Sequence, residues 1–125
     1  MLKEILLYTG SAAIVFWGVA HIVVPTKSIV RGFGPLSENN KRILIMEWIM
    51  EGLALCFIGL LVSIITLLQG ADDPTATIVY RASSLMLVVM AGVSLFTGAR
   101  TSITPMKMCP PIFGGVAILF WFAAG

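Results

Sequence analysis

The sequence predicts an all-α membrane protein, a bundle of four transmembrane helices in antiparallel, up-down order. Two observations carry this prediction. Of the 125 residues, 58% are hydrophobic and only 11% are charged, and the mean hydropathy is +1.01. A soluble domain usually needs about a quarter charged residues to cover its surface. In addition, the apolar residues gather into four runs separated by short polar segments, which is typical of a multi-pass membrane protein.

The lengths of the four runs suit a bilayer. An apolar core about 30 Å thick needs about 20 helical residues at about 1.5 Å each. We expect spans at about 4–24, 43–69, 75–99 and 106–124. The last apolar run begins only at Ile112, so the fourth helix crosses the bilayer only if it starts near Pro105 and continues through Pro110 and Pro111. The chain, 1–125, then forms one integral membrane domain.

Capping residues mark two of the expected helix starts. Ser37 can cap a helix that begins at Glu38 and runs through the headgroup region into the second span. Asp73 followed by Pro74 is typical of a helix start, with an acidic cap and a proline at the first helical position. The loop between the second and third spans is short, which predicts that these helices are antiparallel neighbours.

Basic residues predict the orientation. The 25–42 loop and the 100–109 connection hold six of the eight Lys and Arg residues: Lys27, Arg31, Lys41, Arg42, Arg100 and Lys107. The other side holds only Lys3 and Arg81. We expect the protein to lie in the cell (inner) membrane. The positive-inside rule then predicts that the 25–42 loop is cytoplasmic and that both termini are on the outer side. The net charge of +2 is too small to indicate a nucleic-acid partner.

Polar side chains from all four spans belong to one level of the membrane. His21 lies near the inner end of the first span, Glu47 and Glu51 lie in the inner part of the second, Arg100 closes the third, and Cys109 opens the fourth. In the predicted topology all of these positions fall toward the cytoplasmic side. We therefore expect them to meet inside the bundle.

The depth of the two carboxylates supports this expectation. If Arg42 marks the interface, Glu47 lies about 7 Å deeper and Glu51 about 13 Å deeper, at about 1.5 Å per residue. A charged acid that faced lipid at the centre of the bilayer would cost about 2.5–3.5 kcal/mol. The two glutamates are four residues apart and share one helix face, so we expect that face to point into the bundle.

Small residues predict where helices pack closely. Gly10 and Gly18 share a face of the first span with His21, and Gly52 and Gly59 form a stripe beside the acidic face of the second span. Glycines allow the backbones of neighbouring membrane helices to approach each other. The sequence thus indicates a compact bundle around the polar groups.

These features together indicate a polar pocket that opens toward the cytoplasm and binds a small amphipathic molecule, such as a quinone or a lipid. A carboxylate beside an imidazole can hydrogen-bond to a carbonyl or hydroxyl head group while apolar walls hold the tail. Such a pair could also carry protons. The expected ligand-binding residues are His21, Glu47, Glu51, Trp17, Trp48, Arg100 and Cys109. No nucleophile elbow, phosphate loop, dinucleotide fingerprint or CxxC pattern assigns a catalytic residue or a cofactor.

Several alternatives remain open at this stage. The polar groups could simply satisfy one another, or the chain could be an accessory subunit of a larger membrane complex or a homo-oligomer. The two glutamates and the histidine could also bind a metal ion. Soft thioether sulfur favours Cu(I), although methionine also fills packing gaps. The candidate copper ligands are Met46, Met50, Met86, Met90, Met106, Met108 and Cys109.

One segment, 18–61, combines several of these features in order. A polar residue and a proline end the first span (His21, Pro25), an aromatic–glycine pair follows (Phe33–Gly34), and an acid (Glu51 or Glu47) precedes small and apolar residues in the second span. In this pattern the segment resembles the DoxX-like superfamily of small four-span membrane proteins, although a basic residue is more usual at the histidine position. The resemblance implies four helices and, for some members, an association with quinone-linked sulfur or redox metabolism.

Overall fold

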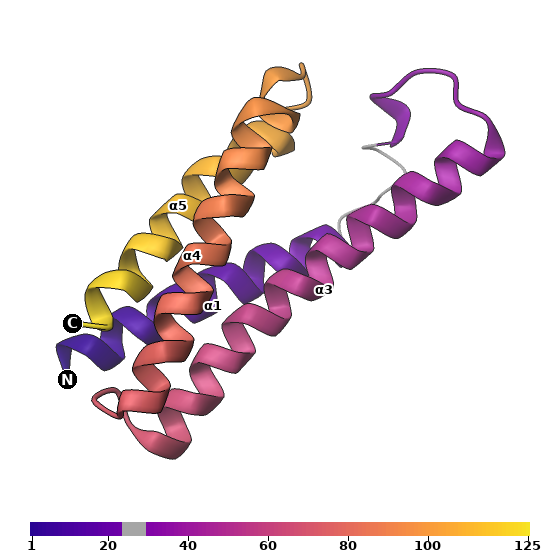
Figure 1. Cartoon of the computed structure of the whole chain (residues 1–125). Coiled ribbons are helices and arrows are strands. Elements are labelled where there is room, and N and C mark those ends of the chain that lie inside the picture. Colours follow the sequence, from indigo (N-terminus) through magenta and orange to yellow (C-terminus); the bar gives the residue numbers. More distant parts are fainter. Residues whose placement is uncertain (24–29) are drawn as a thin grey trace.

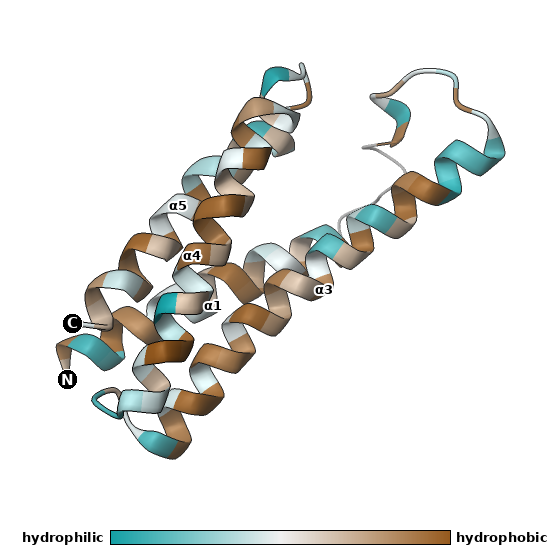
Figure 2. Ribbon diagram, viewed as in Figure 1, coloured by the Kyte–Doolittle hydropathy of each residue, from teal (hydrophilic) through white to brown (hydrophobic). Residues whose placement is uncertain are grey.

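The computed structural model describes residues 1–23 and 30–125, and this part of the chain is helical with no strand. The elements are α1 (Leu2–Val23), α3 (Glu38–Gln69), α4 (Pro74–Phe96), the 3-10 turn η1 (Gly98–Arg100) and α5 (Thr104–Ala123) (Figure 1). Four helices are long and apolar enough to cross a membrane, and apolar residues run along each of them (Figure 2). The predicted all-α class is confirmed, and the chain is a multi-pass membrane protein.

The two predicted helix caps are confirmed. Ser37 Oγ accepts a hydrogen bond from the Asn40 backbone N–H at 3.2 Å. Asp73 Oδ1 accepts hydrogen bonds from the backbone N–H groups at 75 and 76, at 2.8 Å and 3.0 Å, and Pro74 occupies the first helical position. α3 has 32 residues, or about 48 Å at 1.5 Å each. It therefore extends beyond an apolar core of about 30 Å.

The fourth helix meets the condition that the sequence sets for it. α5 begins at Thr104, has Pro105 in its first turn and continues through Pro110 and Pro111. These two prolines remove the N–H groups that would bond to the carbonyl groups one turn earlier. The helix still reaches 20 residues, which is enough to span the core.

α1 and α3 pack backbone against backbone at glycines. A Cβ atom on Gly18 would lie 2.6 Å from the Gly52 carbonyl oxygen, and one on Gly52 would lie 2.7 Å from the Gly18 carbonyl oxygen. One on Gly59 would lie 2.8 Å from the Ser11 carbonyl oxygen. The predicted close packing of these glycines is confirmed, and it fixes the distance between the two helices around His21.

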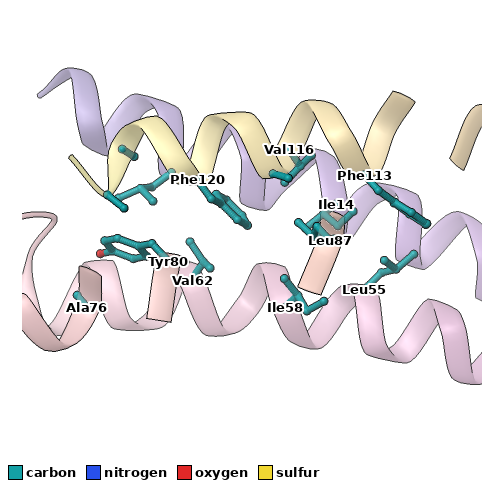
Figure 3. Close-up of a cluster of buried hydrophobic side chains, with 14 of the residues drawn as sticks. Ile14, Leu55, Ile58, Val62, Ala76, Tyr80, Leu87, Phe113, Val116 and Phe120 are labelled. Atoms are coloured by element: carbon teal, nitrogen blue, oxygen red, sulfur yellow. The ribbon is translucent and has the colours of Figure 1, made fainter. Parts of the chain in front are cut away.

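α4 and α5 form the second pair, and the buried core joins the two pairs. Ser84 Oγ donates a hydrogen bond to the Ala117 carbonyl oxygen at 2.7 Å. A Cβ atom on Gly10 of α1 would lie 2.8 Å from the Phe120 ring of α5. All four helices contribute to the apolar cluster of Figure 3, which includes Ile14, Leu55, Val62, Tyr80, Leu87, Phe113 and Phe120.

α3 and α4 are neighbours only near the loop that joins them. There, Thr66 Oγ1 and the Tyr80 hydroxyl share a buried hydrogen bond of 2.9 Å. Toward their other ends the two helices diverge (Figure 1). The prediction that they are neighbours therefore holds at the loop end, and the divergence leaves room between the pairs at the opposite end.

The first and last residues lie at the same end of the bundle as the α3–α4 loop (Figure 1). Lys3 Nζ is 2.8 Å from Asp72 Oδ1, and the Arg81 guanidinium donates to the Gly125 carbonyl oxygen at 3.4 Å. These contacts are compatible with the predicted up-down order. The predicted first-span end at Val24, together with Pro25 and Lys27, lies outside the described residues.

The ion pair at this end has a measurable consequence. The hydrogen bond from Lys3, together with its charge, holds the pKa of the exposed Asp72 carboxyl below its ordinary value. We expect Lys3→Gln to raise the Asp72 pKa, as measured by NMR titration of labelled aspartate in detergent micelles. Because the folded-state pKa is lowered, the pair stabilises the fold above the unfolded-state pKa. That stabilisation is lost as the pH falls through the folded-state value. Equal midpoints in both proteins would contradict the ion pair.

Candidate functional site

His21 is the centre of the polar cluster. Its side chain is 2% exposed, and Nδ1 lies 2.9 Å from the Trp17 carbonyl oxygen one turn earlier in α1. Because a carbonyl oxygen only accepts hydrogen bonds, Nδ1 carries the hydrogen in this contact. With the hydrogen on Nδ1, the neutral form of the imidazole has the lone pair of Nε2 free for groups on the other helices.

Side chains from two further helices approach that nitrogen. Glu51 Oε1 of α3 is 3.8 Å from His21 Nε2, and Cys109 Sγ of α5 is 4.0 Å from it. The three potential ligand atoms all lie within 4.8 Å of one another. Cys109 is buried, whereas the Glu51 side chain is 34% exposed. Three helices thus bring a carboxylate, an imidazole and a thiol to one place, which we call the His21–Glu51–Cys109 cluster.

Two indole rings enclose the imidazole. The Trp48 ring stacks on it with 4.4 Å between centroids, and the Trp17 ring meets it edge-on at 5.5 Å. In each tryptophan the Nε1–H group is buried and has no hydrogen-bond partner. Such a buried, unpaired donor costs about 1–3 kcal/mol. The surroundings of the cluster therefore contain two donors that an acceptor on a bound molecule could satisfy.

A cavity of about 590 Å³ adjoins the cluster. It lies where α3 diverges from the α4–α5 pair, and its size is ordinary for a small-molecule site. Its polar lining includes Glu51, Cys109 and Ser94. The rest of the lining is mainly apolar and includes Leu44, Met50, Met86, Val89, Met90, Val93, Met106 and Phe113. The cavity thus has polar groups beside the cluster and a mainly apolar lining elsewhere, with Glu47 and Thr97 as further polar lining residues.

The structure places the other predicted site residues as follows. Trp48 and Glu47 line the cavity, and Glu47 is exposed one turn before Glu51. Trp17 contacts His21 but is not part of the cavity lining. Five of the seven predicted residues therefore gather at the cluster: His21, Glu51, Cys109, Trp17 and Trp48.

Arg100 lies away from this group. It is exposed, and its guanidinium carbon is 5.4 Å from the centre of the Phe96 ring. The α-helical geometry ends at Thr97, and the chain continues into the turn η1. This turn directs Arg100 away from the helix face that lines the cavity. Arg100 therefore does not join the other predicted site residues.

The methionines divide into two groups. Met50, Met86, Met90 and Met106 line the cavity, whereas Met46 and Met108 are exposed and do not. The pair Met46/Met50 therefore does not face the cavity together. The first group forms part of the apolar wall of the cavity. Copper binding through the methionines stays a prediction.

The cavity wall from α4 was missed by reasoning from sequence. Val89 and Val93 line the cavity, but each is an ordinary apolar residue of a membrane span. The available signal was their spacing, because residues 86, 89, 93 and 97 follow the three- and four-residue steps of one helix face.

The chain matches no protein-family model, no curated protein and no solved structure. Fold and site define its class: a multi-pass, four-helix membrane protein with a polar cluster beside an apolar cavity.

Proposed function

We propose that this protein binds a small amphipathic molecule with a carbonyl or hydroxyl head group, such as a quinone or a membrane lipid. The head group occupies the polar end of the cavity beside the His21–Glu51–Cys109 cluster, and the apolar body lies between α3 and α4. One observation carries the proposal: an apolar cavity of about 590 Å³ ends at buried groups that have unused hydrogen-bonding capacity.

The polar end of the cavity offers both kinds of hydrogen-bonding partner. Among the side chains that line the cavity, the Trp48 indole N–H and the Cys109 thiol can donate and the Glu51 carboxylate can accept. His21 is not part of the lining, but its Nε2 lies 3.8 Å from the Glu51 carboxylate. A ligand carbonyl needs only donors, and a hydroxyl can use a donor and an acceptor together. The imidazole and carboxylate could also exchange protons with such a ligand.

The apolar part of the cavity suits a hydrocarbon or ring body. Methionine side chains adapt their shape to irregular partners, and Met50, Met86 and Met90 contribute to the wall together with the Phe113 ring. The cavity is partly open. A tail longer than the cavity could therefore continue into the surrounding lipid.

The membrane and the orientation belong to the proposal as well. We propose that the protein lies in the cell (inner) membrane with both termini outside. The N-terminal turns of α3 and α5 hold Lys41, Arg42 and Lys107, and both helices begin at the end of the bundle remote from the termini (Figure 1). The resemblance to DoxX-like proteins supports a quinone as the ligand. The roles of accessory subunit and homo-oligomer stay predictions.

A matched pair of leucine variants tests the proposal. Glu51→Leu removes the acceptor beside His21 at similar volume, and an apolar residue is well suited to a membrane helix. Losing the hydrogen bond that a ligand hydroxyl donates to this carboxylate, worth about 1.5–3 kcal/mol, should weaken the binding of a short-chain quinol roughly 10- to 150-fold. Glu47→Leu, one turn away at the exposed rim, should change the affinity by less than about threefold.

Binding is measured with purified protein in detergent micelles, as the change in tryptophan fluorescence on addition of a short-chain quinol. Trp17 and Trp48 lie beside the proposed head-group position, so a bound quinol should change their emission. A dispersed phospholipid competes for the same site if the natural ligand is a lipid. Equal effects of the two variants, or unchanged binding in Glu51→Leu, would show that the cluster is not the head-group site.

A further inference from the structure

We infer that His21 Nε2, the Glu51 carboxylate and Cys109 Sγ form a site for a borderline-soft divalent metal ion, for which Zn²⁺ is the best fit. Three helices would each supply one ligand, and the fourth position would be open toward the cavity. The metal site does not depend on the amphipathic ligand. Only the suggestion that a ligand oxygen could take the fourth position rests on the proposed function.

The distances between the ligand atoms suit this ion after a small closure. Nε2 is 3.8 Å from Glu51 Oε1 and 4.0 Å from Cys109 Sγ, and all three atoms lie within 4.8 Å of one another. Tetrahedral zinc, with bonds of about 2.0 Å to nitrogen and oxygen and about 2.3 Å to sulfur, keeps its ligand atoms about 3.3–3.5 Å apart. The three separations would therefore have to shorten by about 0.4 to 1.3 Å, which rotation of the Glu51 and Cys109 side chains can supply.

The histidine is already oriented as a ligand. Metal-binding histidines usually donate their second N–H to a carbonyl or carboxylate, which fixes the tautomer and the ring direction. His21 has this arrangement, because Nδ1 is 2.9 Å from the Trp17 carbonyl oxygen and Nε2 faces the other two ligands. The stacked Trp48 ring further restricts rotation of the imidazole.

The ligand types select the ion. A thiolate and an imidazole favour zinc and its neighbours among the transition metals over Mg²⁺ and Ca²⁺, which prefer oxygen ligands. One thiolate, one carboxylate and one neutral imidazole around a divalent ion sum to zero charge. A neutral assembly avoids the cost of an uncompensated charge in apolar surroundings.

The unpaired indole donors give a second, independent indication. Nε1–H of Trp17 and Nε1–H of Trp48 are buried next to His21 without an acceptor. Binding of a metal ion converts the thiol of Cys109 to a thiolate, which is a stronger acceptor than the thiol. Ordered water at the open position would be another acceptor for these donors.

Cobalt reports directly on the sulfur ligand. The purified protein in detergent is stripped with a chelator, titrated with Co²⁺ and followed by absorption spectroscopy. We expect one Co²⁺ per chain, with a thiolate-to-cobalt charge-transfer band and the visible bands of tetrahedral cobalt, and we expect Zn²⁺ to displace them. Cys109→Ser should abolish the charge-transfer band. Cys56→Ser is the matched control and should keep it, because Cys56 faces the Val15 carbonyl oxygen of α1 and not the cluster.

The ligand set is tested by further variants. Glu51→Gln should weaken Co²⁺ binding at least tenfold while circular dichroism and gel filtration stay as in the wild type. Absence of the charge-transfer band in the wild type, or its survival in Cys109→Ser, would overturn the inference. Quinone binding to the metal-stripped protein is measured in parallel. A protein that binds quinone but no cobalt contradicts only the metal site, and one that binds cobalt but no amphipathic ligand contradicts only the proposed function.

Discussion

Replacing Gly52 with alanine is expected to destabilise the bundle by about 1–3 kcal/mol, the usual range for overpacking a well-packed core. The added Cβ atom would lie 2.7 Å from the Gly18 carbonyl oxygen and 2.9 Å from the Cβ atom of His21. A backbone oxygen cannot move away without moving its helix. Relief of the clash therefore separates α1 from α3 and draws His21 away from Glu51. Denaturant unfolding in mixed micelles, followed by circular dichroism, measures the loss.

Gly92→Ala is the matched control for this prediction. Gly92 lies in α4, and a Cβ atom there would meet no heavy atom within 4 Å. Alanine is favoured over glycine inside a helix by roughly 0.5–1 kcal/mol, so this variant should be as stable as the wild type or slightly more so. If the two alanine variants unfold alike, α1 and α3 are not held together by the Gly18–Gly52 contact.

Filling the cavity with a tryptophan is expected to reduce ligand affinity at least tenfold and to leave the fold unchanged. Val89 lines the cavity from α4 and its side chain is 60% exposed. The larger ring of Val89→Trp can therefore enter the cavity without overpacking the buried core. It takes the space that the apolar body of the ligand needs. Equilibrium binding of a radiolabelled short-chain quinone measures the affinity without relying on tryptophan fluorescence.

Leu95→Trp controls for the insertion of a large ring into α4. Leu95 is 52% exposed and does not line the cavity, so this variant should bind as the wild type does. Comparable weakening by both variants would mean that the ring acts through the helix and not by filling the cavity. Wild-type affinity in Val89→Trp would mean that the ligand lies elsewhere.

Much of the fold can be predicted from the sequence because few backbone structures can span a membrane. Backbone groups in lipid must bond within the segment, so a long apolar run becomes a helix. Ser37 and Asp73 then set two helix starts, and the glycine stripes on spans one and two indicate which faces meet. The angle between α3 and α4 could not be predicted in this way. This angle depends on how α3 packs against α1 and how α4 packs against α5. The short loop between α3 and α4 allows the two helices either to stay side by side or to diverge.

The candidate site was partly predictable for a related reason. His21, Glu51 and Cys109 are polar residues at one depth, and exposure to lipid would be costly for them, so they meet inside the bundle. Arg100 lies beyond the end of α4, in a 3-10 turn that leaves it exposed and outside the cavity lining. The walls at Val89 and Val93 could not be recognised, since apolar residues that face a cavity and those that face lipid look alike in a sequence.

The most direct test of the binding proposal is native mass spectrometry of the protein extracted from its own membrane without added lipid or quinone. We expect the wild type to retain one amphipathic molecule of a defined mass per chain, and both Glu51→Leu and Val89→Trp to lose it while Leu95→Trp keeps it. A wild-type protein that carries no such molecule, or variants that all retain it equally, would contradict a binding site between α3 and α4.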